Sequence, residues 1–405
     1  MENPKIRFKG FTKDWEQRKL GDIGSTFTGL SGKTKEDFGH GDAQFITYMN
    51  VFSNPVANLE MTEAVEIDAK QNCVKKGDVF FTTSSETPEE VGMSCVMPEN
   101  KDNIYLNSFC FGYRPTEKFD LDYLAYVLRA DSFRQEMTFL AQGISRYNIS
   151  KNKVMEVSIP IPNLEEQTMV GQYFSNLDHL ITLHQRKCDQ TKNLKKYMLQ
   201  KMFPQNGAKV PEIRFDGYTY DWEQRKLGDL VNRITRKNQD LVSELPLTIS
   251  AQYGLIDQNE FFDKRVASKD VSGYYLIENG EFAYNKSTST DAPWGAIKRL
   301  DRYENGVLST LYIVFGIKEN NLVDSDFLVS YYSTNLWHKG IHEIAAEGAR
   351  NHGLLNIAPA DFFETKLMIP QDIEEQKKIG KYFEELDHLI TLHQRQHKLH
   401  LNMLL

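Results

Sequence analysis

The sequence predicts an α+β fold made of two similar halves, each a mixed α/β module followed by a long helix. Three observations support this prediction. The chain repeats itself over a long period, each half places β-rich runs ahead of a helical segment, and each half closes on a coiled-coil pattern. Two apolar seams in one chain most simply cover each other, so we expect two long antiparallel coiled-coil helices and a pseudo-two-fold internal duplication.

The repeat consists of two blocks in each half. Residues 4–22 return as 211–229 with 15 of 19 positions identical, and residues 173–186 return as 382–395 with two changes. The offsets of 207 and 209 residues exceed the roughly 20 to 50 residues of solenoid repeats. The segments between the blocks differ in sequence. This pattern favours two modules that act on different targets while the repeated blocks meet one partner twice, with a purely historical duplication as the alternative.

The first variable segment contains short β-rich runs at residues 44–51, 78–83 and 108–113, separated by clusters of Gly, Pro, Asn and Asp. Such clusters mark turns, so the runs are expected to be strands. From Asp120 onward the apolar residues change to helical spacing, and the Asp120 carboxylate is a suitable N-cap. We therefore expect one helix to follow the strands.

The second variable segment has the same order of features. Its β-rich runs lie at residues 247–251, 281–285 and 308–315, and a helical pattern extends from about residue 325 to 346. We therefore expect a second mixed α/β module.

A long helix is predicted after each module. An Ile-Pro pair, at residues 161–162 and 369–370, is followed by Glu-Glu-Gln, which places acidic side chains in the first turn of a helix. The first helix is expected to end before Pro204, and its apolar residues step by three and four as in a coiled coil.

Composition and charge limit the class of protein. The chain has 405 residues, 26% of them charged, and a formal net charge of −8. An acidic chain does not coat nucleic acid by bulk charge, so a DNA role needs local basic patches or a basic partner. No apolar run approaches the roughly 20 residues that span a membrane, and no signal peptide opens the sequence. Four cysteines without paired spacing are typical of reduced thiols, so we expect a cytoplasmic protein.

Several catalytic motifs are approached but not completed. Residues 29–34 look like the end of a phosphate-binding loop, but Phe27 occupies the position of its first glycine. Residues 37–41 match the Asp-x-Gly-x-Gly of methyltransferases, but a polar run precedes them where a buried strand is needed. The acids within residues 359–366 are too close together for a nuclease metal site formed by two strands. We therefore expect no catalytic residue in this chain.

Two histidines, His393 and His397, stand four residues apart on the second predicted helix. This spacing places both on one helix face, where they could bind a metal ion. No carboxylate or third histidine joins them convincingly. The pair therefore favours polar breaks in a coiled-coil seam, and we expect no metal site.

Polar loops at two places in each half carry side chains suited to reading DNA. One loop follows a strand and is rich in hydroxyls and amides, and the other follows the module's helix and gathers cations and amides. Arg and Lys neutralise phosphates, Arg also reads guanine, and Asn pairs with adenine. The candidate DNA-binding residues are Thr82, Thr83, Ser84, Arg146, Asn148, Lys151 and Lys153 in the first half, and Asn285, Lys286, Ser287, Arg350, Asn351 and His352 in the second. Mixed polar loops also occur on ordinary surfaces, so taken alone they leave both interpretations open.

As an ordered and twice-repeated set, the motifs resemble those of one family, the DNA-specificity subunits of type I restriction-modification systems. The resemblance covers essentially the whole chain. The residues that carry it are the Trp-Glu-Gln-Arg-Lys-Leu-Gly-Asp openings at Trp15 and Trp222, the Ile-Pro pairs with Glu-Glu-Gln at Ile161 and Ile369, and the Tyr-Phe…Leu-Asp-His-Leu-Ile-Thr-Leu-His-Gln-Arg helices at Tyr173 and Tyr382.

The resemblance implies two target-recognition domains, each reading half of an asymmetric, bipartite double-stranded DNA site. Residues 1–160 and 206–368 would form these domains. Residues 161–205 would form a central spacer helix that also contacts the methyltransferase, and residues 369–405 a C-terminal helix paired with it. The subunit would be non-catalytic and bind no cofactor.

The resemblance also implies partners, namely two methyltransferase subunits that use S-adenosylmethionine and two restriction subunits that use ATP and Mg²⁺. The repeated helices would then bind two identical methyltransferase subunits in equivalent ways. The candidate partner-binding residues are Tyr173, Phe174, Leu177, Leu180, Tyr382, Phe383, Leu386 and Leu389. A self-contained DNA-modifying or DNA-cleaving enzyme with a degenerate site, or a protein-only coiled-coil adaptor, are the alternative functions.

Overall fold

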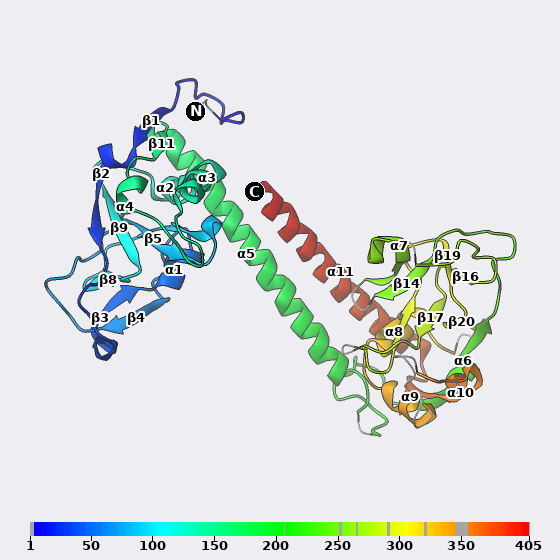
Figure 1. Cartoon of the computed structure of the whole chain (residues 1–405). Coiled ribbons are helices and arrows are strands. Elements are labelled where there is room, and N and C mark those ends of the chain that lie inside the picture. Colours follow the sequence, from blue (N-terminus) through cyan, green and yellow to red (C-terminus); the bar gives the residue numbers. More distant parts are fainter. Residues whose placement is uncertain are drawn as a thin grey trace. The chain divides into compact units, whose positions relative to one another are not determined.

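The computed structural model describes residues 4–205, 207–250, 253–264, 266–289, 292–319, 322–345 and 355–404 (Figure 1). It contains two compact units. Unit 1 comprises residues up to 183 together with those from 397 onward, and unit 2 comprises residues 184–396. Each unit contains one mixed α/β module and parts of both long helices.

The core of unit 1 is a four-stranded antiparallel sheet with the strand order β2-β9-β5-β7. Successive side chains of β5 point to opposite faces, so Phe81 packs in a cluster with Leu124 and Phe133, and Phe80 in a cluster with Val51 and Leu106. Both faces are covered, which explains the unbroken apolar run. The strands are β2 (Gly24–Thr28), β9 (Cys110–Pro115), β5 (Val79–Thr82) and β7 (Ser94–Val96).

A smaller three-stranded sheet with the order β4-β3-β8, several short helices and short 3₁₀ turns complete the module of unit 1. The sheet contains β3 (Phe38–Ile46), β4 (Thr62–Val65) and β8 (Ile104–Leu106). The helices are α1 (Tyr48–Ser53), α2 (Leu121–Val127), α3 (Asp131–Leu140) and α4 (Lys151–Val154). The 3₁₀ turns are η1 (Leu20–Asp22), η2 (Lys35–Asp37) and η3 (Pro88–Glu90).

The strands expected at 78–83 and 108–113 are confirmed by β5 and β9, and Asp120 caps α2 by accepting from the Tyr123 amide at 3.0 Å. Two expectations were wrong in part. The run at 44–51 is only half strand, because Thr47 caps α1 by accepting from the Asn50 amide. The single helix expected after Asp120 is two helices, since Ala130 between them has an extended backbone.

Unit 2 repeats the four-stranded sheet with the equivalent order β13-β20-β17-β18. Two further strand pairs, β14-β15 and β16-β19, lie in the same module. The sheet strands are β13 (Val231–Ile234), β20 (Ile313–Ile317), β17 (Phe282–Asn285) and β18 (Ala296–Arg299). The paired strands are β14 (Leu247–Ser250), β15 (Gly254–Asp257), β16 (Tyr275–Glu278) and β19 (Asn305–Leu308). The helices are α6 (Leu227–Leu230), α7 (Gln258–Phe262), α8 (Ser325–Tyr332), α9 (His338–Ile344) and α10 (Pro359–Glu364).

In unit 2 the strands expected at 247–251 and 281–285 are confirmed by β14 and β17 within the described residues. The run at 308–315 was wrongly expected to be one strand. It contains the end of β19, a turn in which Tyr312 N donates to Ser309 O, and the start of β20. The helix expected from 325 is again two helices, α8 and α9, and its expected end at 346 lies outside the described residues.

The first repeated block of each half, the opening block at residues 4–22 and 211–229, is attached to its module by antiparallel β pairing. In unit 1, β1 (Glu16–Lys19) pairs antiparallel with β11 (Ser158–Ile161), and in unit 2, β12 (Glu223–Lys226) pairs with β21 (Lys366–Ile369). The register is the same in both, because Glu16 faces Ile161 and Glu223 faces Ile369. Each opening block therefore closes its module beside the Ile-Pro sequence that precedes the long helix.

The long helices are α5 (Leu164–Lys201) and α11 (Ile373–Leu404), as the acidic first turns and the apolar seam predicted. Within unit 2 they pack antiparallel. His184 contacts His393 and Lys195 contacts Asp387, so an advance along α5 matches a retreat along α11 (Figure 1). Phe203, just beyond α5, packs against Trp222, Phe327 and Phe383 in the core of unit 2.

Among the residues that the structure describes, none of the helices combines the length and the apolar character needed to cross a membrane.

Candidate nucleic-acid interface

The two polar loops predicted in the first half lie side by side in unit 1. Strand β6 (Ser84–Ser85) pairs antiparallel with β10 (Tyr147–Asn148), with Asn148 opposite Ser84. The amide of Ile149 also donates to the carbonyl of Thr83 at 3.0 Å. Two loops more than 60 residues apart in the sequence therefore form one polar surface.

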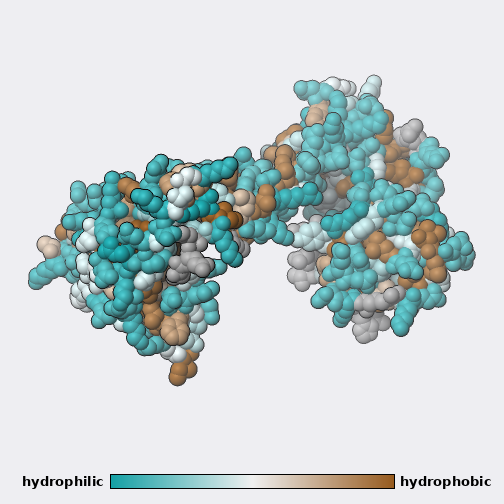
Figure 2. Space-filling view, turned by 90° about the horizontal axis from the view of Figure 1, so that it is seen from above, coloured by the Kyte–Doolittle hydropathy of each residue, from teal (hydrophilic) through white to brown (hydrophobic). Residues whose placement is uncertain are grey.

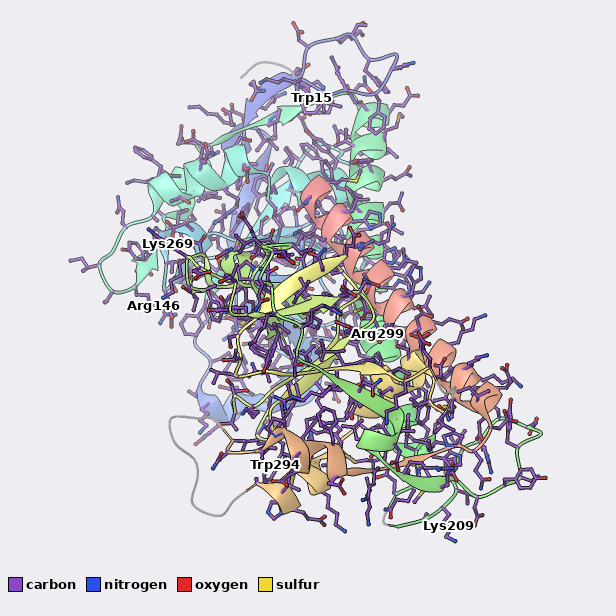
Figure 3. All side chains as sticks on the ribbon, turned by 90° about the vertical axis from the view of Figure 1, so that its right-hand side faces the viewer. Trp15, Arg146, Lys209, Lys269, Trp294 and Arg299 are labelled. Carbon is purple, nitrogen blue, oxygen red and sulfur yellow. The ribbon has the colours of Figure 1, made fainter. Side chains whose placement is uncertain are left out.

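The basic side chains of this surface, and the amide of Asn148 among them, are exposed to solvent. Arg146, Asn148, Lys151 and Lys153 are all exposed, and Figure 3 shows Arg146 on its loop. Gly143 begins the loop with a φ of +153° in close contact with the Arg146 carbonyl, where a Cβ would meet that oxygen at 2.0 Å. The loop thus folds back tightly and presents its basic side chains outward.

Three predicted residues of the strand-following loop are less accessible. Thr82 has no exposed surface, and its hydroxyl accepts from the Met93 amide at 3.0 Å. Ser84 is buried, and its carbonyl accepts from the Tyr48 hydroxyl at 2.7 Å. The Thr83 hydroxyl donates to the Phe109 carbonyl at 2.8 Å. Thr82 and Ser84 do not fit a direct DNA contact in this conformation, because their polar atoms hold the loop in place.

Unit 2 contains the same kind of bond beside its Asn285 loop. The amide of Leu355 donates to the carbonyl of Lys286 at 3.0 Å, as Ile149 does to Thr83. Asn285 accepts from the Ser287 amide at 3.0 Å and donates to the Tyr312 hydroxyl at 3.3 Å. The remaining candidates of this half, Arg350, Asn351 and His352, lie outside the described residues.

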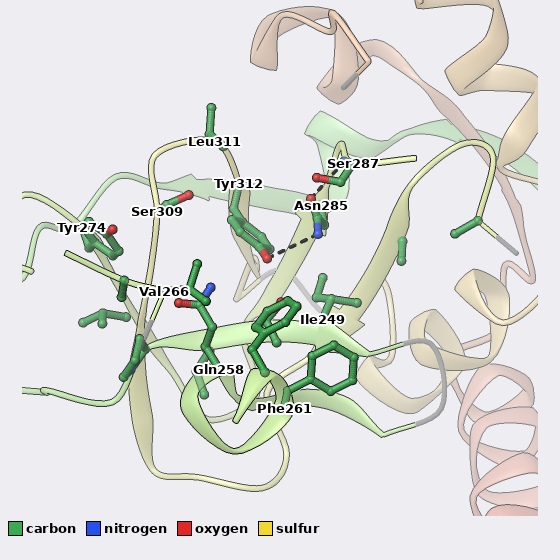
Figure 4. A pocket seen from close by; sticks show the side chains of 18 of the residues that line it. Ile249, Gln258, Phe261, Val266, Tyr274, Asn285, Ser287, Ser309, Leu311 and Tyr312 are labelled. Atoms are coloured by element: carbon green, nitrogen blue, oxygen red, sulfur yellow. Dashed lines mark hydrogen bonds between the residues drawn. The ribbon is translucent and has the colours of Figure 1, made fainter. Parts of the chain in front are cut away.

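A pocket of about 490 Å³ opens beside the Asn285 loop (Figure 4). Asn285, Ser287 and Tyr312 line one part of it and Phe261 another. The Gln258 Oε1 atom is buried there without a hydrogen-bond partner among the described residues. This pocket was not predicted from the sequence. The adjacent aromatic residues Phe261 and Phe262, which are exposed in the structure, were the feature that could have indicated it. Aromatic walls with a free acceptor suit a flat, polar group such as a nucleobase.

Two arginines of unit 1 use their guanidinium groups in hydrogen bonds within the module, so these groups are not available to a ligand. Arg129 donates to the carbonyls of Val51, Phe52, Asn54 and Ser94. Arg134 holds the Pro88–Glu90 turn through the carbonyls of Glu89, Val91 and Gly92. Burial lowers the pKa of both, that of Arg134 to about 10. Basic residues counted from the sequence alone therefore overstate the charge available to a partner.

The predicted partner-binding residues on the long helices divide by burial. Two are exposed and three are partly exposed, whereas three are buried and pack inside the chain. The exposed residues are Tyr173 and Leu389, and the partly exposed ones are Phe174, Leu180 and Tyr382. The buried residues are Leu177, Phe383 and Leu386, of which the last two belong to the core of unit 2. These three do not fit a direct contact with a partner, because the chain itself covers them.

In each half, one arginine and one glutamate of the repeated sequence form an internal ion pair that was not predicted from the sequence. Arg7 makes a bidentate ion pair with buried Glu166, at 2.5 and 2.8 Å, and Arg214 makes the equivalent pair with buried Glu375, at 2.7 and 2.8 Å. Each of these ion pairs forms a clamp that fastens the opening block to the first turn of a long helix. The glutamates come from the repeated Glu-Glu-Gln sequence, so structural demands explain part of its identity between the halves.

The charged and polar character of the surface is visible in Figure 2, where hydrophilic residues cover most of the face shown and hydrophobic ones form small groups. Within the described part of the chain, no three His, Cys, Asp or Glu side chains come together as metal ligands. His393 instead contacts His184 across the helix pair, with 3.2 Å between the Nδ1 atoms.

Two modules on a repeated frame, each with an equivalent backbone bond beside its strand-following polar loop, define a protein with two related modules. Residues 12–193 and 220–402 match the family model described as the type I restriction modification DNA specificity domain. The chain therefore belongs to the family of type I restriction-modification DNA-specificity subunits.

Comparison with individual proteins agrees with the family match. The chain is 27% identical over 416 residues to a putative type I restriction enzyme MjaX specificity subunit of Methanocaldococcus jannaschii, covering 95% of this chain and 89% of that protein. The crystal structure of the type I restriction-modification S subunit from M. genitalium has the same fold, with a TM-score of 0.58, 14% identity and coverage of 99% and 96%.

Proposed function

We propose that each module contacts one half of a bipartite double-stranded DNA site through its polar loops. The observation that carries this proposal is the shared bond, Ile149 N to Thr83 O in unit 1 and Leu355 N to Lys286 O in unit 2. One frame thus holds two different sets of side chains in the same place. A shared frame with different contents is what two readers of different half-sites require.

In this proposal the chain selects the DNA site and does no chemistry itself. Two methyltransferase subunits carry S-adenosylmethionine, and two restriction subunits use ATP and Mg²⁺. The buried thiols of Cys95 and Cys110 fit a passive role, because burial raises the pKa of both, that of Cys95 to about 12. A thiol that stays protonated is a poor nucleophile.

The repeated helix blocks support two equivalent docking sites for the methyltransferase. Tyr173 and Leu389 remain exposed after the chain has folded, whereas Phe383 and Leu386 are used internally. We therefore narrow the docking surface to the exposed and partly exposed members, Tyr173, Phe174, Leu180, Tyr382 and Leu389.

Methylome sequencing of a host that expresses this chain with its methyltransferase tests the proposal. A bipartite methylated motif is expected. Exchange of residues 23–158 for the corresponding module of a relative should then change one half of the motif and leave the other. A change in both halves would contradict independent reading, and methylation without sequence preference would contradict a specificity role. Purified chain that modifies or cleaves DNA alone would establish the enzymatic alternative.

A further inference from the structure

A concave pocket of about 680 Å³ lies in unit 2 where α5, β18, α8 and α11 meet. Its lining includes five cationic side chains and two carboxylates. The cations are Lys192, Lys195, Lys196, Lys298 and Arg299, and the carboxylates are those of Asp301 and Asp387. The pocket therefore carries more positive than negative charge.

The ion pairs show which cations are already satisfied. Arg299 is held by Asp301 at 2.5 Å and by Asp326 at 2.7 Å. Lys195 takes both oxygens of Asp387 at 2.6 Å. Lys298 makes no hydrogen bond or ion pair with the described residues, although it lies within the influence of Lys195 and Asp387. Lys195 therefore occupies the Asp387 carboxylate, and Lys298 has no carboxylate partner of its own among the described residues.

The surroundings of Lys298 make its unpaired ammonium charge unfavourable without a ligand. Burial and the charge of Lys195 lower the pKa of Lys298, and only Asp387 opposes them. A partly buried charge is more stable when it is paired, so an additional anion between Lys195 and Lys298 would stabilise both ammonium groups.

Unit 1 has no such arrangement at the equivalent positions. Lys298 stands opposite Ala283 in the sheet, and in unit 1 the matching position opposite Phe80 is buried Cys95. The repeat equivalent of Asp387 is Asp178, which accepts from the Tyr126 hydroxyl at 2.7 Å instead of binding an ammonium. The basic pocket therefore belongs to the second module and not to the common frame.

The pocket adjoins the loop proposed to read DNA. Asn285 pairs with Ala296 across the β17–β18 hairpin, and Lys298 follows two residues later on the same face, about 7 Å along the strand. Ala296 lines the pocket beside Asn285 as well as a smaller hollow that it shares with Lys195 and Lys298. Ala296 thus separates the pocket beside the reading loop from the hollow that contains the two ammonium groups.

We propose that Lys195 and Lys298 bind a backbone phosphate of the DNA strand whose bases the second module reads. This inference rests on the proposed function and adds a positioning contact to it. A phosphate held about 7 Å along the strand from the reading loop fixes the register of the bases against Asn285 and Ser287.

The test uses the full chain bound to its methyltransferase and a duplex carrying the methylated motif. Binding is measured across a salt series for wild type, Lys298→Gln and Lys195→Gln. Each variant is expected to bind about tenfold more weakly at low salt. The slope of log affinity against log salt should fall by about one, as expected when one phosphate contact is lost. Lys209→Gln, an exposed lysine elsewhere in unit 2, is the matched control and should change neither quantity.

Neutral methylphosphonates placed singly through both half-sites then locate the contact. In wild type, one position in the half-site of the second module should weaken binding, and in Lys298→Gln the same position should have a smaller effect, because only Lys195 then remains to lose the phosphate charge. Lys298→Arg should restore most of the affinity, because it keeps the charge. Thermal melting of the variants confirms that they fold, and removing the unpaired charge of Lys298 should not lower the melting temperature.

The outcomes separate the two levels of the proposal. Specific binding by wild type with an unchanged salt slope and methylphosphonate profile in Lys298→Gln would overturn the phosphate site and leave the DNA-reading function standing. Loss of the methyltransferase from the variant complexes, with DNA binding intact, would assign the pocket to a partner's carboxylate and also overturn it. A wild-type complex with no sequence-specific DNA binding would reject the proposed function itself.

Discussion

His184 and His393 occupy equivalent positions of the internal repeat, 209 residues apart, and contact each other with 3.2 Å between their Nδ1 atoms. A contact between equivalent residues is what a local two-fold relation between the two helices produces. One Nδ1 atom must carry a proton and donate the hydrogen bond while the other accepts that hydrogen bond, so two identical residues take different roles.

The histidine contact should appear as an energetic coupling. His184→Leu removes one partner of the Nδ1 hydrogen bond and is expected to lower the free energy of unfolding by about 1 kcal/mol. The double variant His184→Leu/His393→Leu should recover most of this loss, since an apolar pair suits a helix seam. Denaturant unfolding of the two single variants and the double variant measures the coupling. Strictly additive effects would show that the pair does not act as a unit.

The Arg214–Glu375 clamp should be essential for stability. Arg214→Met leaves the carboxylate of Glu375, which is 1% exposed, with the Trp222 indole at 3.3 Å as its one remaining side-chain donor among the described residues. We expect a loss of about 3 kcal/mol, because a buried charge without its partner is costly. Lys226→Met breaks the exposed pair with Glu364 and serves as the control, with little change expected. Equal effects of the two substitutions in denaturant unfolding would contradict a buried clamp.

Stability should fall below pH 6.5 through His338. Burial lowers the pKa of His338 from its ordinary value of 6.5, so the unfolded chain binds a proton that the folded chain resists. The contribution of neutral His338 to the free energy of unfolding is therefore complete above pH 6.5. It declines as the pH falls toward the lowered pKa of His338 in the folded chain. His338→Gln should flatten the pH dependence of the melting temperature over this range, whereas exposed His388→Gln should leave it unchanged. A wild-type profile retained in His338→Gln would refute this.

Arg146 should contribute to the first half-site. Arg146→Ala is expected to weaken binding to a duplex with the methylated motif by about 1 to 3 kcal/mol if the guanidinium reads guanine. If it holds a phosphate, the loss should be uniform across sequences. Lys101→Ala, which removes a hydrogen bond to Gln44 elsewhere in unit 1, is the control. Titrations with substituted first and second half-sites measure the effect, and a loss confined to the second half-site would exclude this assignment.

The repeated helices should bind two methyltransferase subunits. Native mass spectrometry at saturating partner is expected to show two copies per chain. Leu180→Glu and Leu389→Glu, at partly exposed and exposed positions of the repeated block, should each remove one copy. The exposed neighbour Glu385→Gln is a control that should retain both. A single methyltransferase copy bound by the wild-type chain would contradict equivalent binding by the two repeated helix blocks.

The sequence by itself determined the duplication, the module order and the long helices, because each depends on a pattern between near neighbours or on direct identity. Asp120 as an N-cap and the acidic start of α5 are local features of this kind. Local patterns also produced the errors, since Thr47 and Ala130 interrupt elements that the apolar spacing alone would continue.

Only the tertiary structure decided which polar residues reach solvent and which meet each other. The pairing of Ser84 with Asn148, the burial of Thr82, and the meeting of Lys195 with Lys298 all join segments far apart in the chain. Such contacts depend on how sheets and helices pack, and packing is a property of the whole chain that no short window of sequence contains. The frame was therefore visible in the sequence, whereas the surfaces that it presents were set by long-range pairing and burial.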